Sequence, residues 1–444
     1  MEILIASLVV ILLMFLGMAV SFSFLTGSLL YILITGTSMR TIVTTAFFSL
    51  ESFTLLAIPL FMIAGRLMEV SGIAERLIEF SRALLRKVKG GMGAIIPVSS
   101  MMFGALSGSG TATVAALSSI LIPRMEKLGW DKRYSAALLG ASGPLGYMIP
   151  PNMNAILFGV VANTSIAALF LATVVPGILW ALLYILINRI IYPKWYREPE
   201  SNSSPAGVEE TAATTSAVQR SYFTDVFTTF KMAIPAFIMP LIIFGGIYGG
   251  AFTPTEAGAV ACIYALIAGA FIFKTITIKN GLDAFTDTGK SVGSILIILP
   301  MVMIFTRLLV LNNVPHMIAE GMQNISTNPN VLLFLIVLIL FFAGFFLSTG
   351  VLIFVFTPLL MPTANAIGLD PIQLGTILFV AIGVGTLTPP LAMNLFVVSR
   401  TSGVPMQDLM KPLLPFLFFG AIPILFLVTY VPEISLWLPR LIMG

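Results

Sequence analysis

An apolar stretch from Tyr134 to Val161 is interrupted by Gly143-Pro144-Leu145-Gly146-Tyr147-Met148-Ile149-Pro150-Pro151. A second stretch, from Ile372 to Val398, is interrupted in the same way by Gly383-Val384-Gly385-Thr386-Leu387-Thr388-Pro389-Pro390. Glycine permits unusual backbone angles and proline lacks an N–H donor, so a regular helix cannot pass through either segment. Inside a bilayer, such breaks are tolerated only where they are buried in protein or line a wet cavity. The two segments therefore predict two discontinuous helices beside an internal site.

Two further apolar stretches are broken near their middles. Ser107-Gly108-Ser109-Gly110 interrupts residues 92–121, and Ser348-Thr349-Gly350 interrupts residues 331–360. Both stretches begin and end at polar turns, which is the pattern of a re-entrant helical hairpin that does not cross the membrane. We expect the hairpins at about 92–125 and 330–365, and the broken helices at about 133–163 and 371–400.

These interruptions recur at a fixed interval along the chain. Ser348 lies 239 residues after Ser109, and Pro389 lies 239 residues after Pro150. The matches fall on residues that shape the backbone, although the overall identity between the two halves is weak. Self-similarity at a fixed interval indicates an internal repeat.

The composition places the whole chain in a membrane. Of its 444 residues, 58% are hydrophobic and only 9% are charged, whereas soluble domains carry roughly a quarter charged residues. This balance excludes a soluble globule, a disordered chain and a nucleic-acid-binding protein. A single cysteine (Cys262) and a single histidine (His316) exclude a disulfide framework and multi-histidine metal centres. The fold class that we expect is an all-α polytopic membrane protein.

A polar segment divides the chain near its middle. Residues 193–228 contain a run dominated by Glu, Ser, Thr and Ala, so we expect a solvated linker there. The first repeat then covers residues 1–192 and the second covers residues 229–444. Each is expected to contain three straight spans, a hairpin, one broken span and a final span. Because each repeat would cross the membrane an odd number of times, the second should have inverted topology.

The basic residues support this arrangement. When the expected spans are traced, nineteen of the 23 lysines and arginines fall on one side, and only Arg40 and Arg440 fall on the other. Such an excess marks the cytoplasmic side, so both termini are expected on the opposite, periplasmic side. The amphipathic segment Ile73–Lys89 is expected to lie along the cytoplasmic surface. Arg66 and Arg307 fall within spans and are expected to reach the interface from helix ends.

Inverted repeats with interrupted helices indicate a secondary transporter with a site near the bilayer midplane. A helix end leaves unpaired N–H or C=O groups that carry about half a charge, so N-terminal ends attract anions and unwound carbonyls can coordinate cations. No carboxylate accompanies the breaks, which favours Na⁺ over Ca²⁺ or Mg²⁺ and argues against a proton relay. The side-chain oxygens available there belong to Ser107, Ser109, Thr111, Asn152, Ser348, Thr349, Thr386, Thr388 and Asn394.

Other interpretations of these segments are weaker. One run of small residues often serves only helix packing in lipid, but two runs in register, each followed by a broken span, favour a site. An intramembrane Ser–His protease would require His316 beside Ser109, and these residues lie in different halves. The filter sequence Thr-Val-Gly-Tyr-Gly of potassium channels is not present. We therefore expect neither an enzyme nor a channel, and no cofactor besides a coupling ion.

The same segments resemble a known family. The run Ser107-Gly-Ser-Gly-Thr-Ala-Thr-Val-Ala-Ala116, followed by Ile122-Pro-Arg-Met125, is similar to the large membrane subunit of tripartite ATP-independent periplasmic (TRAP) transporters. Ile149-Pro-Pro151, Thr253-Pro-Thr-Glu-Ala-Gly258 and Leu387-Thr-Pro-Pro-Leu-Ala-Met-Asn-Leu-Phe396 continue the resemblance. It extends from about the first span to the last, with only the linker unmatched.

The resemblance implies an elevator-type transport core in the bacterial cytoplasmic membrane. It also implies two partners, a small four-helix membrane subunit and a soluble periplasmic receptor that captures an organic acid or related solute, with uptake driven by sodium. Carried onto this chain, the sodium-binding positions are Ser107, Ser109, Gly110, Asn152, Ser348, Thr349, Gly385, Thr386 and Thr388. The positions expected to contact the solute are Thr111, Gly143, Gly146, Pro150 and Asn394. The alternative is a stand-alone ion-coupled carboxylate carrier of a related inverted-repeat fold.

Overall fold

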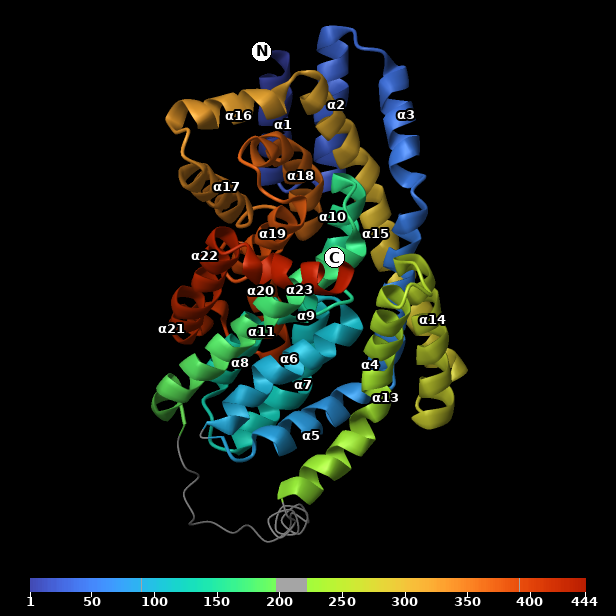
Figure 1. Cartoon of the computed structure of the whole chain (residues 1–444), viewed down its shortest axis with the longest axis vertical. Helices are drawn as coiled ribbons and strands as arrows, with labels where there is room; N and C mark the ends of the chain where they lie inside the picture. Colours follow the sequence, from blue (N-terminus) through green and yellow to red (C-terminus); the bar gives the residue numbers. More distant parts are fainter. Residues whose placement is uncertain (89, 197–221, 391) are drawn as a thin grey trace.

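A computed structural model describes residues 1–88, 90–196, 222–390 and 392–444. Within these ranges every regular element is a helix, which confirms the all-α membrane class (Figure 1). Among the described residues, seven helices are long and apolar enough to cross a bilayer, or eight if one bent pair counts as a single span.

The first half begins with a helical scaffold and continues into a hairpin, a broken helix and a long span. The scaffold consists of α1 (Glu2–Phe15), α2 (Val20–Thr35), α3 (Met39–Leu50), the turn η1 (Phe53–Leu56), α4 (Ala57–Val70) and α5 (Ile73–Leu85). The remainder consists of α6 (Gly91–Ser107), α7 (Gly110–Lys127), α8 (Lys132–Ser142), α9 (Leu145–Met148), α10 (Met153–Ala162), α11 (Ile166–Ile191) and η2 (Tyr192–Lys194).

The second half repeats this order. Its scaffold consists of α13 (Tyr222–Tyr248), α14 (Pro254–Ile267) with η3 (Ala268–Ile272), α15 (Ile278–Leu311) and α16 (Val314–Ile325). It continues with α17 (Pro329–Ala343), α18 (Thr349–Ala366), α19 (Pro371–Gly385), α20 (Met393–Ser402), α21 (Met406–Phe416), η4 (Leu417–Ala421), α22 (Ile422–Tyr430) and α23 (Glu433–Met443).

Ordered elements occupy both ends of the linker expected at residues 193–228. Helix α13 already begins at Tyr222, whose hydroxyl donates to the carbonyl oxygen of Leu84 (2.9 Å), so contact with α5 orders this end. At the other end, Trp195 and Tyr196 pack against aromatic rings near the start of α8, and Tyr196 forms a bridge with Trp130. The rest of the expected linker, residues 197–221, lies outside the described residues.

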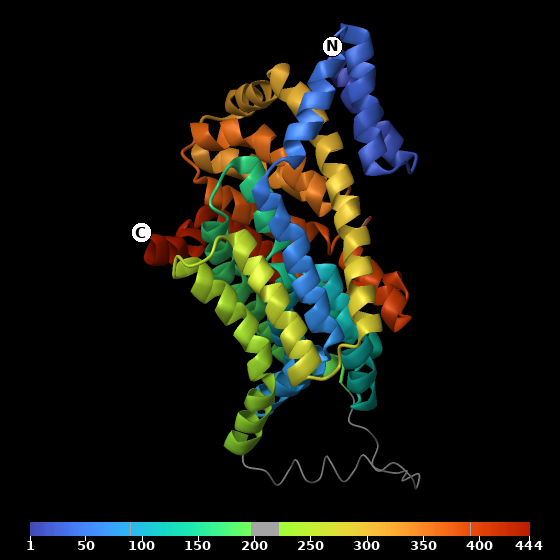
Figure 2. The ribbon, with the colours of Figure 1, turned by 90° about the vertical axis from the view of Figure 1, so that its right-hand side faces the viewer.

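The two halves exchange equivalent contacts. The second part of the first broken helix, α10, packs on α18 of the second hairpin, and α20 packs on α7 of the first hairpin. In the scaffold, α14 packs on α4 while α2 packs on α15, and α4, α13, α14 and α15 lie side by side in Figure 2. In Figure 1, α5 follows α4 at the lower end of the molecule, and α16 follows α15 at the upper end. Hairpin tips from both halves are thereby brought to the breaks of both broken helices.

Two glycine pairs allow each hairpin to approach the broken helix of its own half. A Cβ at Gly104 of α6 would stand 2.7 Å from the carbonyl oxygen of Gly146 in α9. A Cβ at Gly385 of α19 would stand 2.5 Å from the carbonyl oxygen of Gly344, just after α17. Because both obstacles are backbone atoms, rotation of a side chain could not make room.

Ion pairs connect α5 to its neighbours on both sides. The Glu79 carboxylate accepts hydrogen bonds from Arg82 of the same helix and from Arg124 of α7, at the base of the first hairpin. Arg86 pairs with Asp225 of α13, at 3.4 Å. Burial of the Glu79 carboxyl opposes ionisation, but the hydrogen bonds and charges of Arg124 and Arg82 outweigh burial and hold the pKa of Glu79 below its usual value.

Candidate functional site

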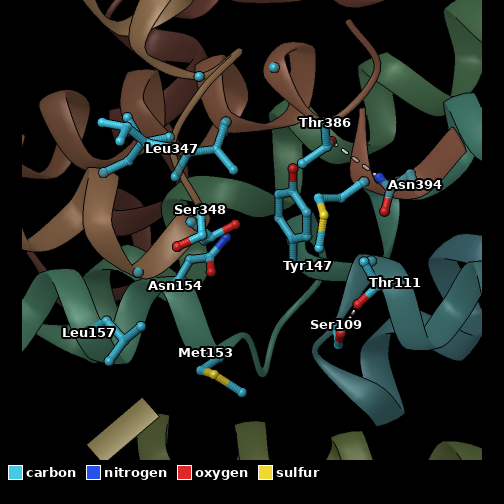
Figure 3. A pocket seen from close by; sticks show the side chains of 18 of the residues that line it. Ser109, Thr111, Tyr147, Met153, Asn154, Leu157, Leu347, Ser348, Thr386 and Asn394 are labelled. Atoms are coloured by element: carbon cyan, nitrogen blue, oxygen red, sulfur yellow. Dashed lines mark hydrogen bonds between the residues drawn. The ribbon is translucent and has the colours of Figure 1, made fainter. Parts of the chain in front are cut away.

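A cavity of about 320 Å³ lies where the two hairpin tips meet the two helix breaks. Its lining comes from α7, α10, α18 and α20, with further residues from α9, α15, the end of α19 and the turn after α17. Figure 3 shows polar side chains from both halves around it. The residues that line this cavity include hydroxyl, amide and apolar side chains, and none of them is charged.

Four helices begin at this cavity. Side chains cap two of them, since Ser109 accepts a hydrogen bond from Ala112 N and Asn152 accepts one from Ala155 N. No side chain caps α18 or α20. The first-turn N–H groups of a helix carry partial positive charge, so these starts offer hydrogen-bond donors to an anion without a basic side chain, while the ends of α17 and α19 bring carbonyl groups to the same lining. The helices begin at Gly110, Met153, Thr349 and Met393.

The cavity includes eight of the fourteen positions expected from the sequence. The eight are Ser109, Gly110, Thr111, Ser348, Thr349, Gly385, Thr386 and Asn394. The other six lie near it without lining it, and they are Ser107, Gly143, Gly146, Pro150, Asn152 and Thr388. The fourteen positions therefore do not all face one space, and their expected roles in binding sodium or solute stay predictions.

Three of the remaining positions have identifiable structural roles. Gly143 makes room for the side chain of Asn394, because a Cβ on Gly143 would stand 2.6 Å from Asn394 Cγ. Gly146 forms the glycine crossing with α6 described above. Asn152 is 1% exposed, and its Oδ1 accepts from Ala155 N at 2.7 Å as the cap of α10.

Ser107 lies beside a second, much smaller cavity. This space of about 10 Å³ is lined by Ser107, Gly108 and Pro151 together with apolar residues of α4, α6 and α10. It is about large enough for one water-sized sphere. The Ser107 hydroxyl lies 3.1 Å from Thr113 Oγ1, and Gly108 approaches the Pro151 carbonyl so closely that an added Cβ would stand 2.8 Å from that oxygen.

The amide of Asn394 has a fixed orientation. The Thr386 hydroxyl donates its proton to the carbonyl oxygen of Gly383 (2.8 Å), so Thr386 Oγ1 can only accept the hydrogen bond from Asn394 Nδ2 (3.1 Å). The Oδ1 atom of Asn394 is consequently a buried acceptor with no partner among the described residues. Buried amide oxygens without partners are rare, and this one is placed to accept from a ligand or coordinate a cation.

Sequence reasoning missed two polar residues of the cavity. Asn154 is 6% exposed, and its Nδ2 is buried with no hydrogen-bond partner in the part of the chain that the structure describes. Tyr147 also lines the cavity and lies between the two groups of polar side chains in Figure 3. A signal for Asn154 exists, because Met-Asn follows each proline pair, at Asn154 and at Asn394. One additional residue after the second pair shifts the interval to 240 and obscures the match.

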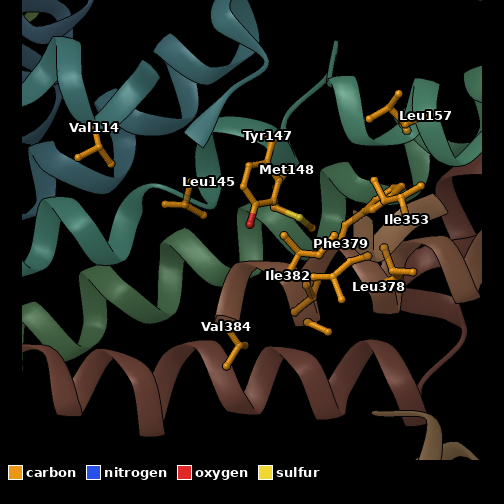
Figure 4. Packing of buried hydrophobic residues seen from close by; sticks show 14 of the residues in the cluster. Val114, Leu145, Tyr147, Met148, Leu157, Ile353, Leu378, Phe379, Ile382 and Val384 are labelled. Atoms are coloured by element: carbon orange, nitrogen blue, oxygen red, sulfur yellow. The ribbon is translucent and has the colours of Figure 1, made fainter. Parts of the chain in front are cut away.

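Apolar packing holds the breaks in place. Figure 4 shows Tyr147 and Met148 in one layer with Phe379 and Ile382 of α19. Met148 and Phe379 are fully buried. Because protein interiors are close-packed, this layer holds the two broken helices in a fixed position relative to each other.

Residues 7–434 match the family described as "Tripartite ATP-independent periplasmic transporter, DctM component". The chain belongs to this family. It is 33% identical over 416 residues to the C4-dicarboxylate TRAP transporter large permease protein DctM of Pseudomonas aeruginosa, covering 94% of this chain and 93% of that one. It is 32% identical over 440 residues to the sialic acid TRAP transporter large permease protein SiaM of Vibrio cholerae, covering 97% of each.

A solved structure shows the same fold at lower identity. The permease matches the YdaH transporter of Alcanivorax borkumensis with a TM-score of 0.60 and 16% identity, over 88% of each chain. The resemblance to TRAP large subunits expected from the sequence is thus confirmed. The protein is a multi-pass membrane permease of a TRAP transporter, and it is a transport protein rather than an enzyme.

Proposed function

We propose that this permease moves a small organic anion across the bacterial inner membrane, coupled to sodium. The convergence of four helix N-termini on a cavity lined by uncharged side chains supports an anionic solute. Such N-termini favour carboxylate and similar groups because their N–H groups point at the ligand. Relatives named for C4-dicarboxylates and for sialic acid fit the same chemical class.

Besides Ser109 and Thr111 at the start of α7, the cavity has two polar clusters that contain an amide. Asn154 of α10 lies near Ser348 at the start of α18, and Asn394 of α20 lies near Thr386 on the far side of Tyr147 (Figure 3). Each cluster combines an uncapped helix start with an amide, so a solute with two polar ends would satisfy both. We therefore favour a carboxylate that carries a second polar group.

Sodium binding is supported by individual oxygen atoms that lie next to the breaks in an otherwise mainly apolar lining. The small cavity beside Ser107 and Pro151 has room for one ion, and its neighbours supply hydroxyl and carbonyl oxygens. The unpartnered Oδ1 of Asn394 offers a comparable oxygen in the second half. Oxygen ligands without a carboxylate suit a weakly bound monovalent cation better than a divalent one.

The reciprocal contacts support inverted repeats and an elevator motion. In this proposal, the hairpins and broken helices move as one body relative to a scaffold that includes α4, α13, α14 and α15. Gly65 of α4 touches the first hairpin tip, since an added Cβ would stand 2.7 Å from the carbonyl oxygen of Leu106. A small residue is needed where a moving tip slides past a helix. Both termini are proposed to be periplasmic, and the partners are a small membrane subunit and a periplasmic solute receptor.

Uptake into proteoliposomes tests the proposal. Ser109→Leu fills the cavity at the start of α7, whereas Ser119→Leu changes an exposed residue of the same helix whose hydroxyl bonds only within that helix. With receptor, small subunit and an inward sodium gradient, we expect Ser109→Leu to reduce uptake at least about tenfold and Ser119→Leu to leave it near wild type. Wild-type uptake that ignores the sodium gradient would overturn the coupling. Unchanged uptake in Ser109→Leu would overturn the site.

A further inference from the structure

A groove of about 720 Å³ lies between α3 and α15, away from the central cavity. Two arginines, Arg40 of α3 and Arg307 of α15, line the same groove. Their neighbours are mainly hydroxyl side chains on one face of α3, and the full lining is Ser38, Arg40, Thr41, Thr44, Thr45, Phe48, Ser49, Met303, Arg307 and Leu311.

The groove lies near one end of the helical bundle. Arg40 lies one residue into α3, just after the α2–α3 turn at the upper end of the molecule in Figure 1. Arg307 lies about one turn before α15 ends at Leu311. Two cations close to the end of a membrane-spanning bundle stand at the depth of lipid headgroups rather than of acyl chains.

The charges in this groove lack an acidic partner in the described part of the chain. Arg66, Arg124 and Arg440 each pair with a carboxylate, but no ion pair involves Arg40 or Arg307. Two guanidinium groups facing one groove repel each other unless an anion lies between them. A phosphate accepts paired hydrogen bonds from guanidinium groups and also accepts hydrogen bonds from hydroxyls.

The other side of α3 is apolar and exposed. No residue of α3 is buried, and the side chains of Val43 and Phe47 are 64% and 67% exposed. Acyl chains can therefore pack along α3 directly beside the basic groove. This juxtaposition of a phosphate-binding lining with an acyl-binding surface favours a phospholipid over a free anion.

We propose that the α3–α15 groove binds the phosphate headgroup of an anionic phospholipid. Arg40 and Arg307 hold the phosphate from two sides, and the hydroxyls of Thr41 and Thr45 donate to its remaining oxygens. The acyl chains lie over Val43 and Phe47. This site is separate from the transport cavity and does not depend on which solute the permease carries.

Native mass spectrometry of the purified full chain tests the site. The protein is titrated with phosphatidylglycerol, with zwitterionic phosphatidylcholine, and with glycerol phosphate as the soluble headgroup. We expect wild type to bind phosphatidylglycerol at least about tenfold more tightly than phosphatidylcholine, and Arg40→Gln/Arg307→Gln to lose this preference. Arg440→Gln is the matched control, because it also removes an exposed cation, one already neutralised by Glu433.

A second variant separates the groove from general charge effects. Thr45→Leu obstructs the groove without changing the net charge, so it should also weaken phosphatidylglycerol binding at least about fivefold. Equal binding of phosphatidylglycerol by wild type and the double arginine variant would overturn the proposal. Displacement of the lipid by equimolar glycerol phosphate would overturn the assignment to a lipid, because the site would then be one for soluble anions.

Discussion

Replacement of Gly104 by alanine should destabilise the permease through a backbone clash. The new Cβ would stand 2.7 Å from the carbonyl oxygen of Gly146, whereas ordinary contacts begin near 3.4 Å, so α6 and α9 must separate by several tenths of an ångström. Overpacking of this kind costs about 1–3 kcal/mol. Gly293→Ala in α15 is the matched control, because nothing lies within 4 Å of its added Cβ. Both substitutions replace glycine by alanine within a helix and so gain the same helix propensity. The difference between their free energies of unfolding therefore measures the cost of the clash.

At the second glycine crossing, between Gly385 and Gly344, the expected clash depends on which glycine is replaced. A Cβ at Gly385 meets the backbone of Gly344 at 2.5 Å, but a Cβ at Gly344 meets nothing closer than 3.2 Å. Thermal unfolding of the purified protein in detergent should therefore show a drop of a few degrees for Gly104→Ala and Gly385→Ala, and a smaller one for Gly344→Ala. If Gly104→Ala and Gly293→Ala have the same melting temperature, the hairpin and the broken helix do not approach each other as closely as described.

Three further predictions concern α5, the cavity and the cysteine. Because Arg124 lowers the pKa of Glu79, the stabilisation by the ionised carboxylate is present at neutral pH and is lost on acidification. Near pH 7 the wild type should therefore be more stable than Glu79→Gln by less than about 1 kcal/mol, and the two melting temperatures should converge below about pH 4. A difference in melting temperature that does not change with pH contradicts this. Asn154→Leu should reduce solute uptake as strongly as Asn394→Leu while leaving membrane insertion intact, since both remove a buried amide from the cavity; uptake assays with equal protein loading measure this, and wild-type uptake by either variant would remove that residue from the site. Cys262 is 9% exposed, and its thiol donates a hydrogen bond to the carbonyl oxygen of Leu60. It should therefore resist labelling by maleimide in the folded protein and react after denaturation. Rapid labelling of the native protein would show that the contact between α4 and α14 opens.

The sequence predicted the interruptions well because they depend on local chemistry. Ser109 and Ser348 lie at the N-terminal ends of helices in the structure, as expected where short polar residues and glycine stop a helix. The resemblance to TRAP permeases also followed from contiguous motifs. The start of α13 at Tyr222, inside the linker expected at residues 193–228, depends instead on contacts between distant residues, because Tyr222 and Asp225 bond to residues at the C-terminal end of α5.

The facing of side chains at the site could not be predicted in the same way. Fourteen positions were expected, but Asn152 caps a helix and Gly146 serves a helix crossing, while Asn154 and Tyr147 line the cavity. Each break lets the chain leave helical geometry, so the helical period no longer says which side chain faces inward. Residues at a break are therefore easy to locate along the chain and difficult to orient.

The sequence by itself determined where the backbone breaks, that the chain is helical and membrane-embedded, and which family it belongs to. These properties depend on local residue types: proline and glycine stop helices, and long apolar stretches require lipid. Only the tertiary structure decided that four helix starts from two halves meet at one cavity, that Asn394 presents its oxygen there, and that Arg40 and Arg307 share a groove. The shared cavity and the shared groove depend on contacts between residues more than 200 positions apart, which no local pattern encodes. The orientation of Asn394 depends on how its break folds back, because its amide is held by Thr386 on the other side of the proline pair.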